Sequence, residues 1–300
     1  MVARLKSWIE EHCRKCSENV RECLPHAINP FRFSLQVIVE GIFERYLRGS
    51  SVLHNFFPFF IGCENKYLLI MLTFADKVIE FNRRLGYAGE LPEGFQVINP
   101  FRDNPETMEV MHAFYRKYYN DHRKRRFLIG INPGRHGAGV TGIPFTDTKR
   151  LESACGITMH SAHTHEVSSL FVYDMIEAYG GTARFYRDFY INSPFPLAII
   201  RQTGEGKWLN ANYYDDPLLF EHVKEFMIDS LRKHIHMGLD TSAVFILGKK
   251  NGEFIGKINQ QEKLFDKLTV LEHPRYIQQY RSKEKQHYID KYLQAFSRGY

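Results

Sequence analysis

Four short apolar runs constrain the fold of this chain more than any other feature. They cover residues 127–131, 189–191, 243–247 and 268–271, and each ends in a polar or Gly/Pro turn. Stretches with helical periodicity, at 167–187, 216–236 and 257–266, separate most of them. Continuous apolar runs that alternate with helices are typical of a parallel sheet covered on both faces. The sequence therefore predicts an α/β domain built on these four strands.

Further segments extend this pattern. Residues 197–209 hold two short apolar stretches around a Thr-Gly-Glu-Gly turn, which predicts an inserted β-hairpin. The remaining elements that we expect are helices at about 73–85, 105–120 and 282–297 and a short extended piece at 97–100. The basic run 123–126 precedes the first strand, away from the C-terminal strand ends, and is expected to be a solvated face.

Composition excludes several classes of protein. The 300 residues are 44% hydrophobic and 25% charged, a balance that permits a large core. Four of the five cysteines lie in the first 70 residues, and only Cys155 lies beyond them. A body with one cysteine cannot be built on disulfides, so we expect a reducing compartment. No stretch approaches the roughly 18–20 consecutive apolar residues of a membrane span, so no membrane partner is expected.

The excess of positive charge is modest and unevenly placed. Lys and Arg number 40 against 34 Asp and Glu, a formal charge of +6. Residues 273–300 hold six basic and two acidic residues, so the C-terminal end is the most basic part. Such an excess is compatible with a polyanionic partner.

The residues just after the four runs are predicted to form the ligand site. In parallel sheets, ligands bind outside the C-terminal ends of the strands. The first such segment, 130–145, has five glycines in sixteen residues, which allows close approach of the backbone to a ligand. Its formal G-x-G-x-x-G starts six residues after the strand, and no acidic residue ends the second strand, so a dinucleotide site is rejected. No Gly-Lys-Ser/Thr follows, which excludes a P-loop.

Two asparagines and a histidine follow strands in a way that suggests a shared crevice. Asn132, Asn192 and His273 are expected to converge there, with Phe145 as an aromatic plate. Two amides and an imidazole can read the edge of a planar heterocycle, while a phenyl ring stacks on its face. Taken singly, such an asparagine is more often a turn residue and such a histidine more often a strand-end residue, but all three follow strands of the predicted sheet.

The motifs resemble one known family. Residues 130–134, Gly-Ile-Asn-Pro-Gly, and 141–145, Thr-Gly-Ile-Pro-Phe, resemble motif 1 of the single-strand-selective monofunctional uracil-DNA glycosylases (SMUG), within the uracil-DNA glycosylase superfamily. The family's other stretches are matched in order by residues 97–100, by 183–186 with Asn192, and by His273-Pro274 as motif 2. The bacterial second-type SMUG branch is the most similar, and its members begin near the equivalent of Met71.

The resemblance implies a fold and an activity. The fold would be a three-layer α/β/α arrangement around a central four-stranded parallel sheet. The activity would be hydrolysis of the N-glycosidic bond of a flipped-out deoxyuridine, which leaves an abasic site. No cofactor would be needed, DNA would be the partner, and the protein would act as a monomer in the bacterial cytoplasm, at the nucleoid during repair. Residues 71–300 would be the catalytic domain, and residues 1–70 an N-terminal extension without a counterpart in the family.

The resemblance also assigns roles. Asn132 would hold the water that attacks C1′, and His273 would donate to uracil O2 as the base leaves. Asn192 would pair with uracil O4 and N3–H, and Phe145 would stack on the ring. Ile131 and Gly134 of motif 1 are counted among the substrate-binding residues. No lysine stands beside Asn132 as a Schiff-base nucleophile, so no lyase step is expected.

Two departures from the family leave alternatives open. Ala138 and Val140 replace Met and Gln, and this smaller, less polar wall would admit deaminated purines such as hypoxanthine or xanthine. Motif 2 continues with Arg275-Tyr276 where the family has Ser-Pro. Two sets of residues are expected to contact DNA. A wedge residue would fill the gap that the flipped-out base leaves in the helix, and the candidates are Tyr276, Ile277, Gln278, Gln279 and Tyr280. The residues expected to contact phosphates are Arg275, Arg281, Lys283 and Lys285. A catalytically idle base-binding module is the remaining alternative, because Asn132 is neutral.

No metal site is predicted. His160, His163 and His165, and the Cys13-x-x-Cys16 pair, resemble ligand sets only loosely. Superfamily members with an iron–sulfur cluster bind it through cysteines after motif 1, which this chain lacks.

Overall fold

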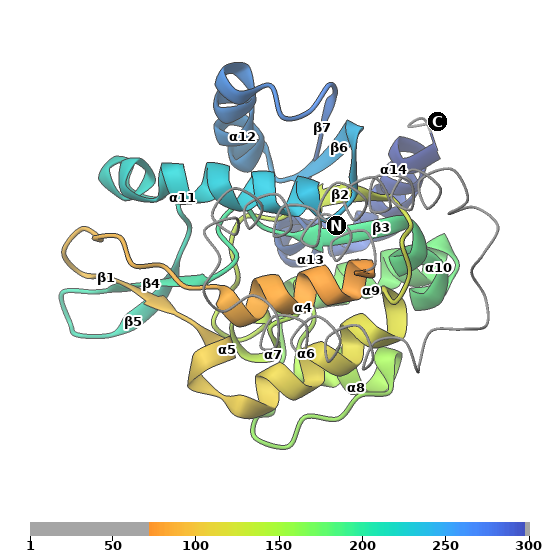
Figure 1. Ribbon diagram of the computed structural model, residues 1–300, viewed down its shortest axis with the longest axis horizontal. Coiled ribbons are helices and arrows are strands. Elements are labelled where there is room, and N and C mark those ends of the chain that lie inside the picture. The colour runs from red at the N-terminus through yellow and green to blue at the C-terminus, as the bar shows by residue number, and fades with distance from the viewer. Residues whose placement is uncertain (1–71, 298–300) are drawn as a thin grey trace, which may run out of the picture. The chain divides into compact units, whose positions relative to one another are not determined.

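The computed structural model describes residues 72–297 of the chain (Figure 1). The predicted N-terminal extension, with its four cysteines, lies outside the described residues. The centre of the described part is a parallel sheet with the strand order β3-β2-β6-β7. Its strands are β2 (Arg125–Ile129), β3 (Phe189–Asn192), β6 (Leu239–Leu247) and β7 (Leu268–Leu271). These are the four apolar runs, so the predicted sheet is confirmed.

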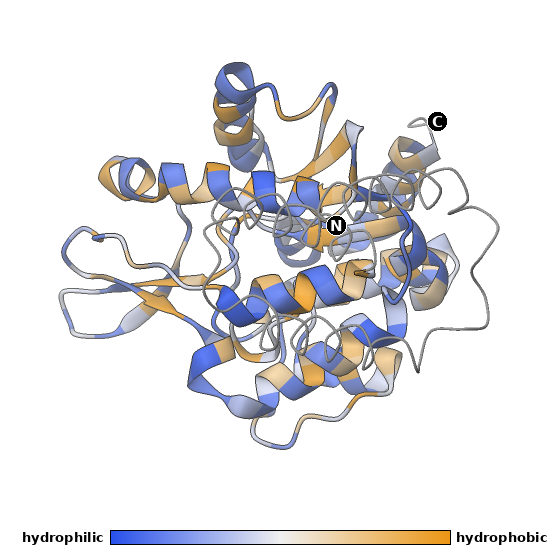
Figure 2. Cartoon of the chain, viewed as in Figure 1, coloured by the Kyte–Doolittle hydropathy of each residue, from blue (hydrophilic) through white to orange (hydrophobic). Residues whose placement is uncertain are grey.

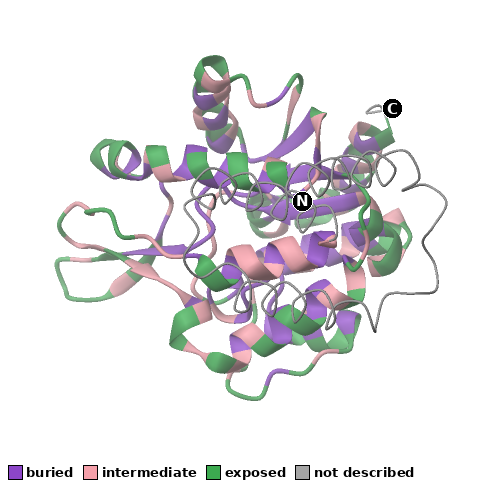
Figure 3. Ribbon diagram, in the orientation of Figure 1, coloured by how far each residue is buried: buried purple, intermediate pink, exposed green. Residues whose placement is uncertain are grey.

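Helices pack against both faces of this sheet. On one face, Phe127 of β2 and Tyr190 of β3 contact His234 of α11 (Pro217–His236) and Phe74 of α4 (Phe74–Arg84). On the other, Phe189 and Phe245 contact Phe296 of α14 (Lys285–Ser297). Alternate residues of each strand thus fill opposite layers of the core, as the pleat requires. Every residue of β2 and β3 is buried, and Figures 2 and 3 show the central strands as largely apolar and buried.

A second, antiparallel sheet lies to one side. The strands β4 (Ala198–Gln202) and β5 (Trp208–Ala211) form the predicted hairpin, and β1 (Phe95–Ile98) pairs with β4. This three-stranded sheet projects at the left of Figure 1. It matters for the site because the end of β5 reaches the loop that follows β2, as described below.

The remaining helices include two that the sequence pattern misplaced. The predicted helix at 167–187 is two helices, α9 (Val167–Tyr179) and α10 (Gly181–Asp188), because Gly180 adopts a left-handed φ of 116°. The helix predicted at 257–266 is α12 (Lys249–Glu262). Gly252 lies in its first turns, and a Cβ there would lie 2.7 Å from Val270 Cγ2, so this glycine permits close packing on β7.

Two of the predicted helices are matched closely: α6 (Pro105–Tyr118) corresponds to the one at 105–120, and the 3-10 turn η1 (Ser282–Glu284) with α14 to the one at 282–297. The helices α5 (Pro100–Asp103), α7 (Ala138–Thr141), α8 (Thr148–Cys155) and α13 (Pro274–Tyr280) were not predicted. Thr73 caps α4 through a capping box with Asp76. None of the helices in residues 72–297 is long and apolar enough to cross a membrane.

The basic run 123–126 is solvated only in its first half, which corrects part of the prediction: Arg123 and Lys124 are exposed, whereas Arg125 and Arg126 begin β2 and are buried. Arg125 is completely buried and donates to the Tyr186 carbonyl and to the Asp121 carboxylate. Its guanidinium lies 4.8 Å from the ring centre of Phe74 and 4.6 Å from that of Tyr119. Arg126 is also buried. Arginines that are paired and stacked on aromatic rings can therefore be buried at the N-terminal end of an inner strand, where the charge pattern predicted exposure to solvent.

Candidate active site

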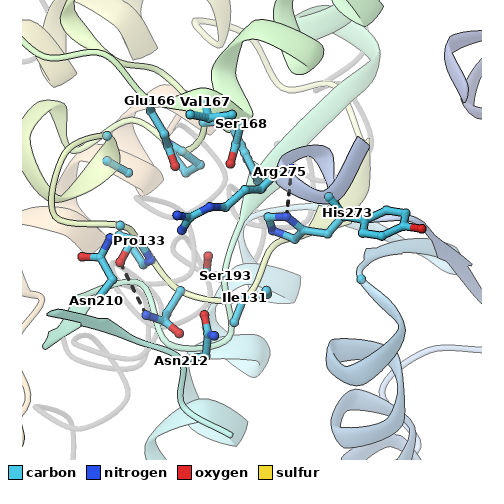
Figure 4. A pocket seen from close by; sticks show the side chains of 18 of the residues that line it. Ile131, Pro133, Glu166, Val167, Ser168, Ser193, Asn210, Asn212, His273 and Arg275 are labelled. Carbon is cyan, nitrogen blue, oxygen red and sulfur yellow. Dashed lines mark hydrogen bonds between the residues drawn. The ribbon is translucent and has the colours of Figure 1, made fainter. Parts of the chain in front are cut away.

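A cavity of about 760 Å³ opens at the C-terminal ends of the central strands (Figure 4). The loop after β2 supplies residues 131–134, the start of α9 supplies 166–168, and the end of the hairpin supplies 210–212. Gly248 after β6 and His273 after β7 complete the wall. The cavity therefore lies where ligands bind in parallel α/β sheets.

Asn132 is held in one orientation by the hairpin. Its Nδ2 donates to the Ala211 carbonyl at 3.0 Å, and its Oδ1 accepts from the Tyr213 backbone N–H at 3.1 Å. Ala211 ends strand β5 and Tyr213 follows it, so the antiparallel sheet orients a side chain that extends from the loop after parallel strand β2. This side chain is neutral and already hydrogen-bonded, so it can orient a ligand but cannot accept a proton.

His273 is the N-cap of α13, and this position fixes its tautomer. The Nδ1 atom accepts from the Arg275 backbone N–H at 3.1 Å, so in the neutral ring the proton is on Nε2. Burial, assisted by the charge of Arg275, lowers the pKa of His273 to about 4. At neutral pH the imidazole is therefore an uncharged donor at the edge of the cavity.

Phe145 lies beside His273 in a strained backbone conformation. Its φ of 54° is in the left-handed region, which a bulky residue rarely adopts. The ring centres of Phe145 and His273 are 5.9 Å apart. A Cβ added at Gly130 would lie 3.1 Å from the Phe145 ring, so glycine at the end of β2 makes room for it. The local strain is thus used to place an aromatic ring in the cavity wall.

Asn192 does not join the other three residues. It is buried at the end of β3, and its Nδ2 donates to Tyr190 Oη at 2.6 Å while its Oδ1 accepts from the Ser193 N–H at 2.8 Å. The following residue, Ser193, lines the cavity instead. The expected convergence thus brings together Asn132, Phe145 and His273, while Asn192 lies behind the wall with its amide engaged.

Motif 1 contributes the other predicted substrate contacts. Ile131, Gly134 and Ala138 all line the cavity. Val140 does not line it, because its side chain packs on the core from α7. The prediction that Val140 enlarges the base pocket is therefore wrong, and only Ala138 remains in that wall.

Helix α13 forms one side of the cavity mouth. Arg275, Tyr276, Gln279 and Tyr280 line it, and Tyr280 is 72% exposed. Gln278, half-buried, does not line the cavity.

Ile277 is fully buried in the core, so it is removed from the wedge candidates. Helical periodicity explains the result, since α13 turns one residue in three or four inward.

The residues predicted to contact DNA phosphates differ in their exposure and in the partners that their side chains already have. Lys283 is exposed in η1, and Arg281 is exposed with its Nε donating to Tyr276 Oη at 3.2 Å. Lys285 pairs with Asp174 of α9 at 2.5 Å. The guanidinium of Arg275 extends across the cavity rather than out from α13, as Figure 4 shows.

Glu166 lines the cavity and was not predicted from the sequence. Burial and the nearby Asp147 carboxylate raise its pKa to about 7, against an opposing effect of Arg275. Asn210 and Asn212 of the hairpin end were also missed. A glutamate before a helix and asparagines near a turn are so common that the sequence held no signal for any of them.

No group of three His, Cys, Asp or Glu side chains within residues 72–297 is arranged to hold a metal ion. The model of the uracil DNA glycosylase superfamily matches residues 116–297. The crystal structure of wild-type SMUG2 from Pedobacter heparinus is 50% identical, with a TM-score of 0.74, over 76% of this chain and 98% of that one. No curated protein matches the chain.

Proposed function

The chain belongs to the uracil-DNA glycosylase superfamily, and from that premise we propose that it is a monofunctional glycosylase that removes uracil from DNA. The flipped-out nucleotide would enter the cavity, and hydrolysis of its N-glycosidic bond would leave an abasic site. The main support is the placement of an oriented neutral amide, Asn132, and an uncharged donor, His273, in one cavity.

The proposed roles follow from the chemistry of these two groups. Asn132 orients the water that attacks C1′. Breaking of the C1′–N1 bond runs ahead of this attack, and the electron pair moves onto the base. His273 donates from Nε2 to uracil O2, where negative charge grows, and a placed donor of this kind is worth several kcal/mol. Phe145 stacks on the base, while Asn192 would have to release Tyr190 to read its edge.

A preference for deaminated purines is the second candidate function. The cavity is about 760 Å³, and Gly134 and Ala138 in its lining take up little of the space. This space would accommodate hypoxanthine or xanthine as well as uracil. The same catalytic groups would serve, because both bases also leave as anions.

We further propose that residues 71–300 are the catalytic domain and that residues 1–70 are an extension dispensable for excision. A monomer would suffice, because one chain supplies both Asn132 and His273. The protein would act in the bacterial cytoplasm, at the nucleoid during repair.

The test is excision from single- and double-stranded oligonucleotides that contain uracil, xanthine or hypoxanthine, followed by alkali. Strand breaks after alkali in uracil substrates are the expected result. Breaks confined to the purine substrates would favour the second candidate, and breaks without alkali would contradict the monofunctional assignment. No break with any base would leave a base-binding module.

A further inference from the structure

Glu166 places an unpartnered carboxylate in the cavity. It is the N-cap residue of α9, yet its side chain makes no capping hydrogen bond. Its Oε2 is buried without a hydrogen-bond partner among the described residues. In Figure 4 the side chain points from the start of α9 toward the centre of the cavity. A buried carboxylate oxygen without a partner costs free energy, so its retention suggests that a ligand supplies the partner.

The motif 1 loop is shaped around this carboxylate. A Cβ at Gly137 would lie only 2.0 Å from Glu166 Oε2, so any other residue there would displace the carboxylate from this position. A Cβ at Gly134 would lie 3.6 Å from Oε1. The carboxylate therefore rests against the loop after β2, which also carries Asn132 and Pro133.

Several charged groups face Glu166. The Asp147 carboxylate accepts the Glu166 backbone N–H at 2.7 Å and also approaches Arg150 and His165. Arg275 of α13 reaches across the cavity, and His136, next to Gly137 in the sequence, also lines it. Burial and Asp147 raise the pKa of Glu166 to about 7, and Arg275 acts in the opposite direction. Near neutral pH this carboxyl can therefore both take up and release a proton.

The proposed reaction needs such a group. The attacking water must lose a proton, but Asn132 cannot accept one. His273 cannot either, because its Nδ1 is occupied by the Arg275 N–H and its Nε2 already holds a hydrogen. The sugar also develops positive charge as the base departs, and a nearby negative charge would stabilise it.

Building on the proposed function, we propose that the Glu166 carboxylate is the general base of the glycosylase and the negative charge that faces the sugar. The water oxygen forms a bond to C1′, and the C1′–N bond breaks with its electron pair passing to the base. The proton of the water passes to the Glu166 carboxylate, and the base leaves as an anion that His273 hydrogen-bonds. Arg275, across the cavity, favours the ionised form of Glu166.

The first test is the pH dependence of single-turnover excision between about pH 5.5 and 8.5. For the wild-type chain, the rate should rise with a midpoint near the Glu166 pKa of about 7. Glu166→Gln keeps the shape but cannot accept a proton, so it should be at least about tenfold slower at pH 8 and show no such rise. Glu177→Gln removes the same charge from an exposed position on α9 and should match wild type.

Arg275→Gln sharpens this test, because loss of the cation should move the midpoint to higher pH. A Glu166→Gln variant that retains the wild-type rate overturns the inference. So does a slower variant that retains the wild-type pH rise, because the titrating group would then be another residue.

The second test needs no turnover. Binding is measured at pH 8 to oligonucleotides with a cationic pyrrolidine or a neutral tetrahydrofuran in place of the deoxyribose. Wild type and Glu177→Gln should prefer the cation by at least about tenfold, and Glu166→Gln should lose that preference. An equal preference in Glu166→Gln, or none in wild type, overturns the inference. If wild type removes no base, the proposed function fails, while this ratio still decides whether Glu166 faces the sugar.

Discussion

The sharpest prediction concerns His273, because two substitutions separate its chemistry from its structural role. His273→Asn keeps a side-chain oxygen that can accept the Arg275 N–H and cap α13, but it lacks the imidazole Nε2 donor. His273→Ala loses both functions. The pair therefore distinguishes loss of a hydrogen bond to the leaving base from loss of a helix cap.

The two roles of His273 set the expected losses of rate and of stability. Removing a placed donor to a developing negative charge costs about 2.7–4 kcal/mol, or roughly 10²- to 10³-fold in rate. Removing an N-cap costs about 1 kcal/mol of unfolding free energy. With a pKa of about 4, His273 is almost entirely neutral at pH 7, so a charged imidazole adds nothing to the rate there.

Single-turnover excision of uracil and denaturant unfolding measure the two quantities. Both variants should lose roughly 10²- to 10³-fold in rate, and only His273→Ala should lose about 1 kcal/mol of stability. The reasoning fails if His273→Asn excises within about threefold of wild type. It also fails if rate losses in both variants simply follow their stability losses.

Three further predictions follow. Asn132→Ala should slow single-turnover excision at least about tenfold, or 1.4 kcal/mol, with DNA binding nearly unchanged; a wild-type rate would remove the residue from the mechanism. Glu166→Gln should leave the unfolding free energy unchanged at pH 4 but raise it by about 3 kcal/mol at pH 8. Folding raises the pKa of Glu166 from 4.5 to about 7. Between these two pH values the folded wild type binds more protons than the unfolded chain, so its stability falls as pH rises through this range. Equal stabilities at pH 8 would contradict this. Tyr280→Ala should weaken binding to uracil-containing DNA by about 1–3 kcal/mol through lost stacking, whereas Lys283→Ala should weaken binding to any DNA sequence equally and reduce the salt dependence; unchanged affinities would exclude contact.

The central sheet could be predicted because its physics is local. Each parallel strand is buried on both faces, so it is a continuous apolar run that needs no knowledge of its neighbours. The start of α12 could not be predicted, because Gly252 indicates a loop unless its contact with Val270 is known. Arg125 was misassigned for the same reason, since its partners Tyr186 and Phe74 come from elsewhere in the fold.

The site was predictable only to the extent that it follows from strand ends. Asn132 and His273 follow strands of one parallel sheet, and parallel strands bring their C-terminal ends to one edge. Asn192 follows the same rule, but hydrogen bonds to Tyr190 and Ser193 turn its side chain away from the cavity. Position along a strand thus fixes where a residue begins, while competing partners fix where its polar atoms point.

Glu166 shows why a site of this kind needs the fold to be understood. An acidic residue at a helix start favourably faces the helix dipole, and a sequence alone gives no reason to look further. The structure removes that explanation, because the carboxylate does not cap α9 and Gly137 makes room for it in the cavity. The charge of Asp147 beside it makes ionisation more costly still. A chain that keeps two acids together in a buried site loses stability at neutral pH, and a function for that ionised carboxylate would account for the loss.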